Sequence, residues 1–297
     1  MYLLKVSDLH KIAIHEKGNK EGRPVIFLHG GPGGSIGEAS FSFFDLDKYH
    51  VIAFDQRGTG KSEPFLERKD NSVFDSVEDI ETIRRHYGFD KIILFGGSYG
   101  TTLALCYAIK YPQNVEHIVL RGVFLGRDED VKWLYQEGAS YIYPIEHEKF
   151  KNHLDASDQG DIIAGYHKIF TTGTTDEVRT AAKIWSDWEN SITCMEPRKI
   201  SPEITDGDLT IAIFECNYFF NHMFWDDDNY ILNNADKIKD LPIDIVHGRF
   251  DVDCRVCGAY DLYKKLDNAK LHIIQNGSHN PYEKDVFEKL KSIMENL

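Results

Sequence analysis

The feature that most constrains the fold is the pentapeptide Gly96-Gly97-Ser98-Tyr99-Gly100, which joins the apolar run Lys91–Phe95 to the segment Thr101–Lys110. The run predicts a buried strand, and the segment predicts a helix that stops before Pro112. A serine between them occupies a tight, strained turn, so the residues two positions away must be glycine to avoid a clash. The turn lifts the hydroxyl above the sheet, beside the free N–H groups of a helix N-terminus. This pattern predicts that Ser98 is a nucleophile.

Other short apolar runs predict further buried strands. They are Val25–His29, Val51–Phe54, His117–Arg121, Ile243–His247 and Leu271–Ile274. Between the early strands, the apolar spacing of Val77–Arg84 predicts a helix that ends near Gly88. Strands that alternate with helices indicate a parallel sheet with helices on both faces.

The alternation stops after about residue 124 and resumes at Leu241-Pro242. The intervening segment has little strand character and is rich in aromatic residues at helical spacing. With the serine turn, this predicts an α/β-hydrolase fold with an inserted helical cap. We expect the core to comprise residues 1–124 and 240–297 and the cap residues 125–239.

A serine hydroxyl needs a base to remove its proton, and in this fold the acid and then the histidine follow the serine along the chain. Asp251 is the predicted acid because it lies in the loop just after a strand. Asp244, inside that strand, and Asp253, farther from its end, are the competing candidates. His279 is the predicted base because it lies in the loop after the last strand, whereas His272 lies within that strand and is expected to pack in the core.

Acyl chemistry also needs N–H donors for an oxyanion. The amide of Tyr99, one residue after the nucleophile, is one predicted donor. The glycine-rich segment HGGPGG (29–34) follows a strand and can approach the reacting carbon closely, and Gly31 is the predicted second donor. A phosphate-binding loop is the rival interpretation, but neither GxGxxG nor GxxxxGK[ST] is present there.

The charge balance, the hydropathy and the cysteines argue against several classes of protein. With 34 basic and 48 acidic residues, the net charge is −14, which argues against a nucleic-acid partner. No apolar run reaches 18 residues, and no signal-peptide layout is present, so we expect a cytoplasmic protein without a membrane span. The five cysteines are expected to be free thiols. Cys254 and Cys257 form a CxxC without a second pair or a histidine cluster, so no metal or redox cofactor is expected.

Several motifs together resemble the prolyl aminopeptidases, also called proline iminopeptidases, along nearly the whole chain. They are HGGPGG (29–34), DQRGTGKS (55–62), GGSYGTTLAL (96–105), LRGVFLGR (120–127), WLYQEGAS (133–140) and HGRFD (247–251). The resemblance implies a triad of Ser98, Asp251 and His279, which agrees with the assignment made from the residues themselves. It implies a serine aminopeptidase that releases an N-terminal proline from small peptides through a prolyl-enzyme, without a cofactor.

The resemblance also implies a substrate site in the cap. Glu189, in a Trp-x-x-Trp-Glu segment, and Glu215, in a Glu-x-x-Tyr-Phe segment, are expected to bind the free amino terminus. Glu215 and Phe219 are four residues apart, so one helix presents a carboxylate and a ring on the same face. The expected walls of the proline pocket are Phe124, Phe219, Cys254 and Tyr135, and Arg121 matches an arginine near that pocket.

Three positions depart from the family pattern. Tyr99 stands where the family usually has tryptophan, Gly277-Ser278-His279 replaces a Gly-His-Ser order, and Arg255 stands where proline is common. The alternatives are a broader aminopeptidase or a carboxylesterase with the same triad, and a non-catalytic receptor with a hydrolase fold. Epoxide hydrolases and dehalogenases are disfavoured because they carry aspartate at the position of Ser98.

Overall fold

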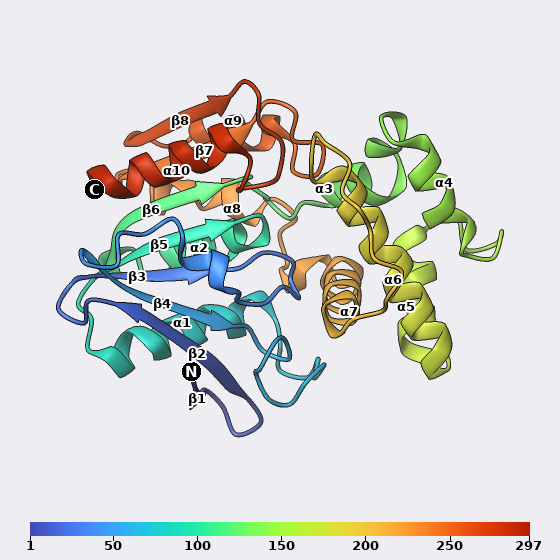
Figure 1. Cartoon of the computed structure of the whole chain (residues 1–297), viewed down its shortest axis with the longest axis horizontal. Helices are drawn as coiled ribbons and strands as arrows, with labels where there is room; N and C mark the ends of the chain where they lie inside the picture. Colours follow the sequence, from blue (N-terminus) through green and yellow to red (C-terminus); the bar gives the residue numbers. More distant parts are fainter.

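An eight-stranded sheet forms the centre of the molecule in the computed structural model, which describes residues 1–297 (Figure 1). The strand order is β1-β2-β4-β3-β5-β6-β7-β8. The strands are β1 Tyr2–Lys5, β2 Lys11–Gly18, β3 Arg23–Leu28, β4 Tyr49–Asp55, β5 Ile92–Gly97, β6 Val115–Arg121, β7 Ile243–Gly248 and β8 Ala269–Ile274. The pairs β1–β2 and β2–β4 are antiparallel, and all other pairs are parallel. The predicted mostly parallel sheet is therefore confirmed.

All six predicted strands are present, and no end is shifted by more than two residues. The two strands that were not predicted, β1 and β2, lie together at one edge of the sheet. The sequence of β2, KIAIHEKG, places polar residues through its second half, which faces partly outward. Its strand character comes from pairing with β4 rather than from an apolar run, because strand propensity depends strongly on such context.

Helices cover both faces of the sheet. The helices are α1 Val73–Tyr87, α2 Tyr99–Lys110, α3 Asp128–Val131, α4 Pro144–Asn152, α5 Ile162–Thr172, α6 Thr175–Ile192, α7 Asp206–Phe220, α8 Tyr230–Asn233, α9 Val256–Tyr263 and α10 Lys284–Asn296. Successive residues of β3 point to opposite faces. Val25 packs in the cluster that includes Val286 and Leu290 of α10, whereas Ile26 and Leu28 join the larger cluster that includes α1 and α2. The predicted end of α1 near Gly88 is confirmed, since Gly88 caps the helix at φ 70°.

The segment between β6 and β7 contains only helices, α3 to α8. Figure 1 shows α4 to α7 beyond the carboxyl ends of the parallel strands, where they form a cap over that edge of the core. Helix α7 packs against both α5 and α6, whereas α8 returns to pack against α2 of the core. Because active sites of open α/β sheets lie at the carboxyl ends of the strands, the cap covers the expected site.

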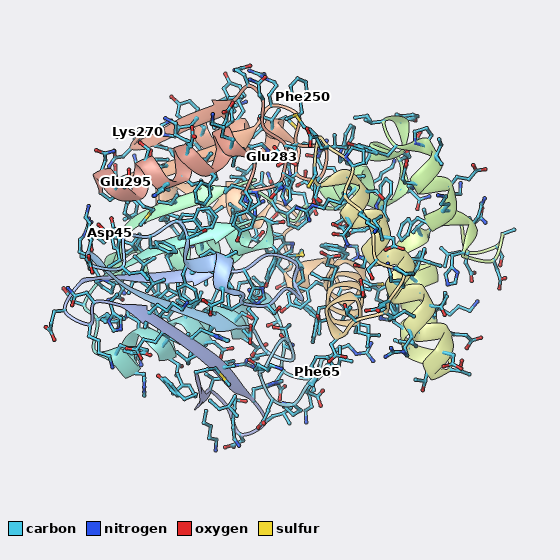
Figure 2. All side chains as sticks on the ribbon, viewed as in Figure 1. Asp45, Phe65, Phe250, Lys270, Glu283 and Glu295 are labelled. Carbon is cyan, nitrogen blue, oxygen red and sulfur yellow. The ribbon has the colours of Figure 1, made fainter.

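Aromatic side chains fill the interior of the cap. Trp185 of α6 is completely buried and contacts Tyr135, Phe150 and Tyr166. Charged side chains such as Lys270 and Glu295 lie on the outside of the core (Figure 2). None of the helices combines the length and the apolar composition that a membrane crossing requires.

Candidate active site

The turn between β5 and α2 has the geometry that its glycines predict. Ser98 has φ 57° and ψ −129°, a conformation that L-residues rarely adopt. A Cβ on Gly96 would lie 2.3 Å from the Gly100 carbonyl oxygen, and a Cβ on Gly100 would lie 2.2 Å from that of Leu28. Both glycines are thus required by close backbone approach, and the surrounding packing holds Ser98 in its strained conformation.

The structure brings Asp251 and His279 together, as the order of residues predicts. Asp251 Oδ2 lies 2.9 Å from His279 Nδ1, which fixes the ring orientation and leaves Nε2 toward the cavity. The other carboxylate oxygen of Asp251 accepts the amide of Cys254 at 2.8 Å, so the acid itself is held in place. Burial lowers the pKa of His279 to about 4, which keeps the imidazole neutral and able to accept a proton near neutral pH.

The Nε2 atom of His279 faces two further charged groups. Arg121 Nη1 lies 3.0 Å from Nε2 and also donates to the His279 carbonyl oxygen at 2.9 Å. Asp253 Oδ2 lies 3.6 Å from the same nitrogen. Ser98 and His279 line one cavity of about 250 Å³, although no hydrogen bond joins them in this structure. Catalytic hydrogen bonds of unliganded enzymes are often loose and tighten only when substrate binds.

The predicted oxyanion donors lie on two sides of Ser98. Tyr99 is the first residue of α2, so its amide has no partner within the helix. Gly31 and Gly30 line the same cavity as Ser98, and a Cβ on Gly30 would lie 3.1 Å from Ser98 Cβ. The ring of His29 anchors the start of this loop, because its Nδ1 lies 2.8 Å from the Gly30 carbonyl oxygen.

Both predicted cap glutamates reach this cavity. Glu189 comes from α6 and Glu215 from α7, and they line the cavity with Ser98 and Asp253. Glu215 Oε2 accepts hydrogen bonds from Trp185 Nε1 at 2.6 Å and from the Tyr135 hydroxyl at 3.2 Å. Glu189 Oε1 is buried and has no hydrogen-bond partner. An unpartnered buried carboxylate oxygen is costly unless a ligand satisfies it.

Burial dominates the electrostatics of these acids. It raises the pKa of Glu215 to about 8, and it raises the pKa of Glu189 well above its ordinary value, with a further contribution from the charge of Glu215. The pKa of Asp253 is also raised by burial. A cation bound between Glu189 and Glu215 would stabilise their ionised forms. Such a cation would lie in the cavity that contains Ser98.

The predicted pocket walls are buried and largely in mutual contact. The ring of Phe219 lies 5.9 Å from that of Phe124 and 5.4 Å from that of Tyr135, measured between ring centroids. Cys254 is buried next to Asp251. None of these four side chains lines the cavity that contains Ser98. Arg121 does line it and contacts the predicted base rather than the aromatic residues.

Two of the departures from the family pattern join the cap to the core. Ser278 Oγ donates to the carbonyl of Thr193, just past α6, at 3.0 Å and to Glu283 at 2.6 Å. Glu283, labelled in Figure 2, precedes α10 and also accepts the amide of Ser278 at 2.7 Å. Arg255, at the start of α9, donates to Asp130 of α3 at 2.6 Å. These substitutions therefore hold the cap against the loops that carry the acid and the base.

Some features of the site escaped prediction. Asp253, a competing candidate for the acid, lies instead between the predicted base and the cap glutamates. Trp185 donates directly to Glu215, which its position on an apolar helix face did not indicate. The expectation that His272 packs in the core is wrong: it is half-buried and pairs with Asp244 at 2.7 Å. A histidine inside a strand next to an acid on the neighbouring strand could have indicated that pair.

Comparisons with known proteins agree with this geometry. A family model described as alpha/beta hydrolase fold matches residues 23–286. The chain is 37% identical to a probable proline iminopeptidase of Leptolyngbya boryana, over 97% of this chain and 91% of that protein. It is 38% identical to the proline iminopeptidase of Xanthomonas citri, over 97% of this chain and 93% of that protein. Among solved structures, an alpha/beta fold family hydrolase from Bacillus anthracis str. Sterne superposes with a TM-score of 0.68 at 19% identity, covering 99% of this chain and 98% of that one, which supports the fold. The chain therefore belongs to the α/β-hydrolase fold family and, within it, to the proline iminopeptidases.

Proposed function

We propose that this enzyme releases an N-terminal proline from small peptides that have a free amino terminus. The observation that carries the proposal is the pair of buried carboxylates, Glu189 and Glu215, in the cavity that contains Ser98. Burial raises the pKa values of both acids in the empty cavity, and a bound secondary ammonium group would stabilise their ionised forms. Because only an N-terminal residue brings that charge, the arrangement favours an exopeptidase. The names of the relatives support proline as the preferred residue.

The mechanism follows from the positions of the polar groups. His279, oriented by Asp251, takes the Ser98 proton at Nε2 once this nitrogen turns from Arg121 to the serine. Ser98 Oγ attacks the proline carbonyl, and the amides of Gly31 and Tyr99 stabilise the oxyanion. His279 then protonates the leaving amine, and water hydrolyses the prolyl-enzyme by the reverse sequence. Each step uses side chains and amides of this chain only.

The acidic lining of the cavity distinguishes this function from the alternatives. A neutral ester offers no positive charge to Glu189 and Glu215, so a carboxylesterase would bury these acids without a use for them. Asp251, His279 and a strained Ser98 are likewise unnecessary in a receptor that does no chemistry. We further expect the enzyme to act in the cytoplasm, since all five cysteines are unpaired.

The test compares an L-prolyl arylamide with its N-acylated analogue, an alanyl arylamide and a simple acyl ester. We expect turnover of the prolyl compound and at least tenfold slower turnover of the other three. Ser98→Ala should abolish turnover, and Glu215→Gln should lower kcat/KM for the prolyl arylamide much more than for the ester. Glu148→Gln, an exposed cap glutamate, is the matched control. Equal rates on the free and the blocked amine would refute the role of the glutamates, and preference for the ester would identify a carboxylesterase.

A further inference from the structure

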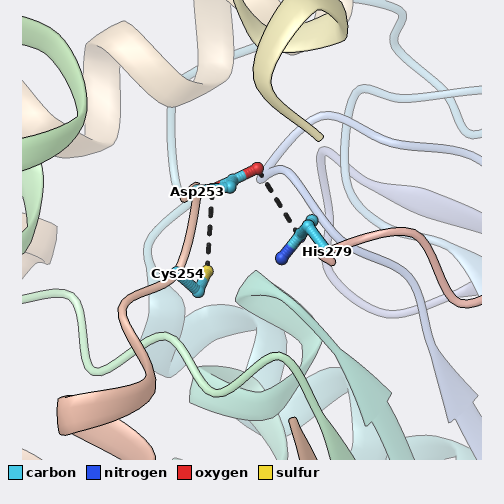
Figure 3. Close-up of side chains that lie close together, drawn as sticks. All are labelled: Asp253, Cys254 and His279. Carbon is cyan, nitrogen blue, oxygen red and sulfur yellow. Dashed lines mark hydrogen bonds and ion pairs between the residues drawn. The ribbon is translucent and has the colours of Figure 1, made fainter. Parts of the chain in front are cut away.

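Asp253, Cys254 and His279 lie close together (Figure 3), and two of them, Asp253 and His279, line the cavity that contains Ser98. Asp253 Oδ2 lies 3.6 Å from His279 Nε2, and Asp253 Oδ1 lies 3.6 Å from Cys254 Sγ. One potential ligand atom from each of the three residues lies within 4.8 Å of the other two, and all three residues are buried. The cluster thus combines an imidazole, a thiol and a carboxylate, the three side-chain types that bind Zn²⁺.

Two separations in the cluster, one at each carboxylate oxygen of Asp253, match those of a tetrahedral zinc site. Zinc lies about 2.0–2.3 Å from nitrogen, oxygen and sulfur ligands, which places neighbouring ligand atoms about 3.3–3.7 Å apart. Both 3.6 Å distances around Asp253 fall in this range. The hydrogen bond from His279 Nδ1 to Asp251 completes the arrangement, because it presents the Nε2 lone pair to the cavity. Metal-bound histidines commonly have such a carboxylate on their other nitrogen.

A bound cation would also stabilise the ionised forms of the acids around this place, whose pKa values are raised by burial. Three acids line the cavity, Glu189, Glu215 and Asp253, against the two guanidinium groups of Arg121 and Arg198. Independently of the cluster, Glu189 Oε1 is buried without a hydrogen-bond partner in the same cavity. A polar oxygen left without a partner inside an acidic cavity points to a cationic ligand there.

We propose that Asp253, Cys254 and His279 bind a thiophilic divalent cation of the Zn²⁺ type, and that this cation inhibits the enzyme. On binding, the Cys254 thiol releases its proton to solvent, while neutral His279 and the Asp253 carboxylate bind directly. Arg121 gives up its contact with Nε2 and keeps its hydrogen bond to the His279 carbonyl. The cation occupies the lone pair that must accept the Ser98 proton, so catalysis stops. This consequence depends on the proposed role of His279 as the base.

Direct binding is tested on the Ser98→Ala variant, which retains all three ligands. Titration with Co²⁺ should produce the near-ultraviolet absorption of a cobalt–thiolate bond, and Zn²⁺ should abolish it by displacement. Adding Cys254→Ser should remove this band, and adding Asp253→Asn should weaken binding at least tenfold. Cys257→Ser is the matched control, since Cys257 is exposed and lies three residues away. A band that persists without Cys254, or that disappears with Cys257, would overturn the proposal.

Inhibition is tested by the rate at which a fluorophosphonate probe labels Ser98, a readout that needs no peptide substrate. Micromolar Zn²⁺ should slow labelling of the wild type, a chelator should restore it, and Mg²⁺ should have no effect, because thiolate and imidazole ligands favour zinc. In Asp253→Asn, the Zn²⁺ concentration for half-inhibition should rise at least tenfold relative to that variant's own uninhibited rate. Unchanged inhibition in this variant would refute the site. Labelling and zinc inhibition in an enzyme that does not cleave prolyl arylamides would instead refute only the proposed peptidase function.

Discussion

Substituting Tyr135 by phenylalanine should change the pH dependence of catalysis in a defined way. The Tyr135 hydroxyl donates to Glu215 Oε2 at 3.2 Å, and Trp185 donates to the same oxygen at 2.6 Å. Tyr135 is almost fully buried, so Tyr135→Phe removes one donor and leaves the cap packing nearly unchanged. The ionised carboxylate loses more than its protonated form, and the pKa of Glu215 rises. Burial and the charge of Asp253 keep the pKa of Glu215 high in both proteins.

The size of the effect follows from the strength of the hydrogen bond. A hydrogen bond to a charged group contributes about 1.5–3 kcal/mol, and the lower value applies because Trp185 remains. Since 1.36 kcal/mol corresponds to one pKa unit, the pKa of Glu215 should rise from about 8 to about 9. In the proposed function the ionised form binds the substrate ammonium, so we expect activity to rise with pH through this pKa. The ratio of wild-type to variant kcat/KM should be about 9 at pH 7, about 5 at pH 8 and about 2 at pH 9.

The assay measures kcat/KM for a prolyl arylamide between pH 6 and pH 9, because this quantity reports the ionisation of the free enzyme. The pKa of His279 is about 4, below this range, and Asp251, whose pKa is raised by burial to about 6, is expected to titrate equally in both proteins. Tyr166→Phe is the matched control: Tyr166 is buried in the cap and contacts Trp185, but it donates to the carbonyl of Phe150. A loss in Tyr135→Phe that is the same at every pH, or an equal shift in Tyr166→Phe, would refute the assignment of Glu215 as the titrating acceptor.

Two further predictions concern the loops around His279. Ser278→Ala removes the hydroxyl that joins this loop to the cap and should lower the free energy of unfolding by about 1–2 kcal/mol in a denaturant titration, whereas Ser292→Ala, on the exposed side of α10, should have no effect. Gly122→Ala places a Cβ 3.0 Å from the His279 ring at φ 60° and should lower kcat about 10–100-fold. Gly88→Ala has the same backbone strain but open space around its Cβ, so kcat should not change; an equal loss of kcat in both variants would contradict displacement of the base.

Local sequence patterns predicted most of the core because each depends on few neighbours. The six apolar strands and the turn at Ser98 carry their signals within about ten residues, so their existence could be predicted and only their ends shifted. Strand β2 could not be predicted because its outer half is polar and its structure depends on pairing with β4, more than thirty residues away. The cap boundaries at residues 124 and 239 remain a prediction.

The residues of the site also divide into those that local sequence patterns predict and those that they do not. Asp251 and His279 could be predicted because each follows a strand whose end must reach the same edge of the sheet. The contacts of Arg121 and Asp253 with His279 could not, since they depend on side-chain orientations across the end of β6 and two separate loops. Glu189 was expected in the site only from the family resemblance, because the burial of its oxygen depends on the packing of α6 against α7.

Burial in this cavity lowers the pKa of His279 and raises the pKa values of Glu189 and Glu215. It keeps His279 neutral, as a base must be, but it favours protonated Glu189 and Glu215, which bind an ammonium poorly. A substrate ammonium resolves this conflict, because both glutamates ionise when they share it. The two ionised glutamates and the ammonium together then carry one net negative charge. This charge stabilises the imidazolium that forms when His279 takes the Ser98 proton. In the proposed mechanism, the free amine of the substrate therefore contributes to the chemical step as well as to binding, and we expect a blocked peptide of the same shape to lack both contributions.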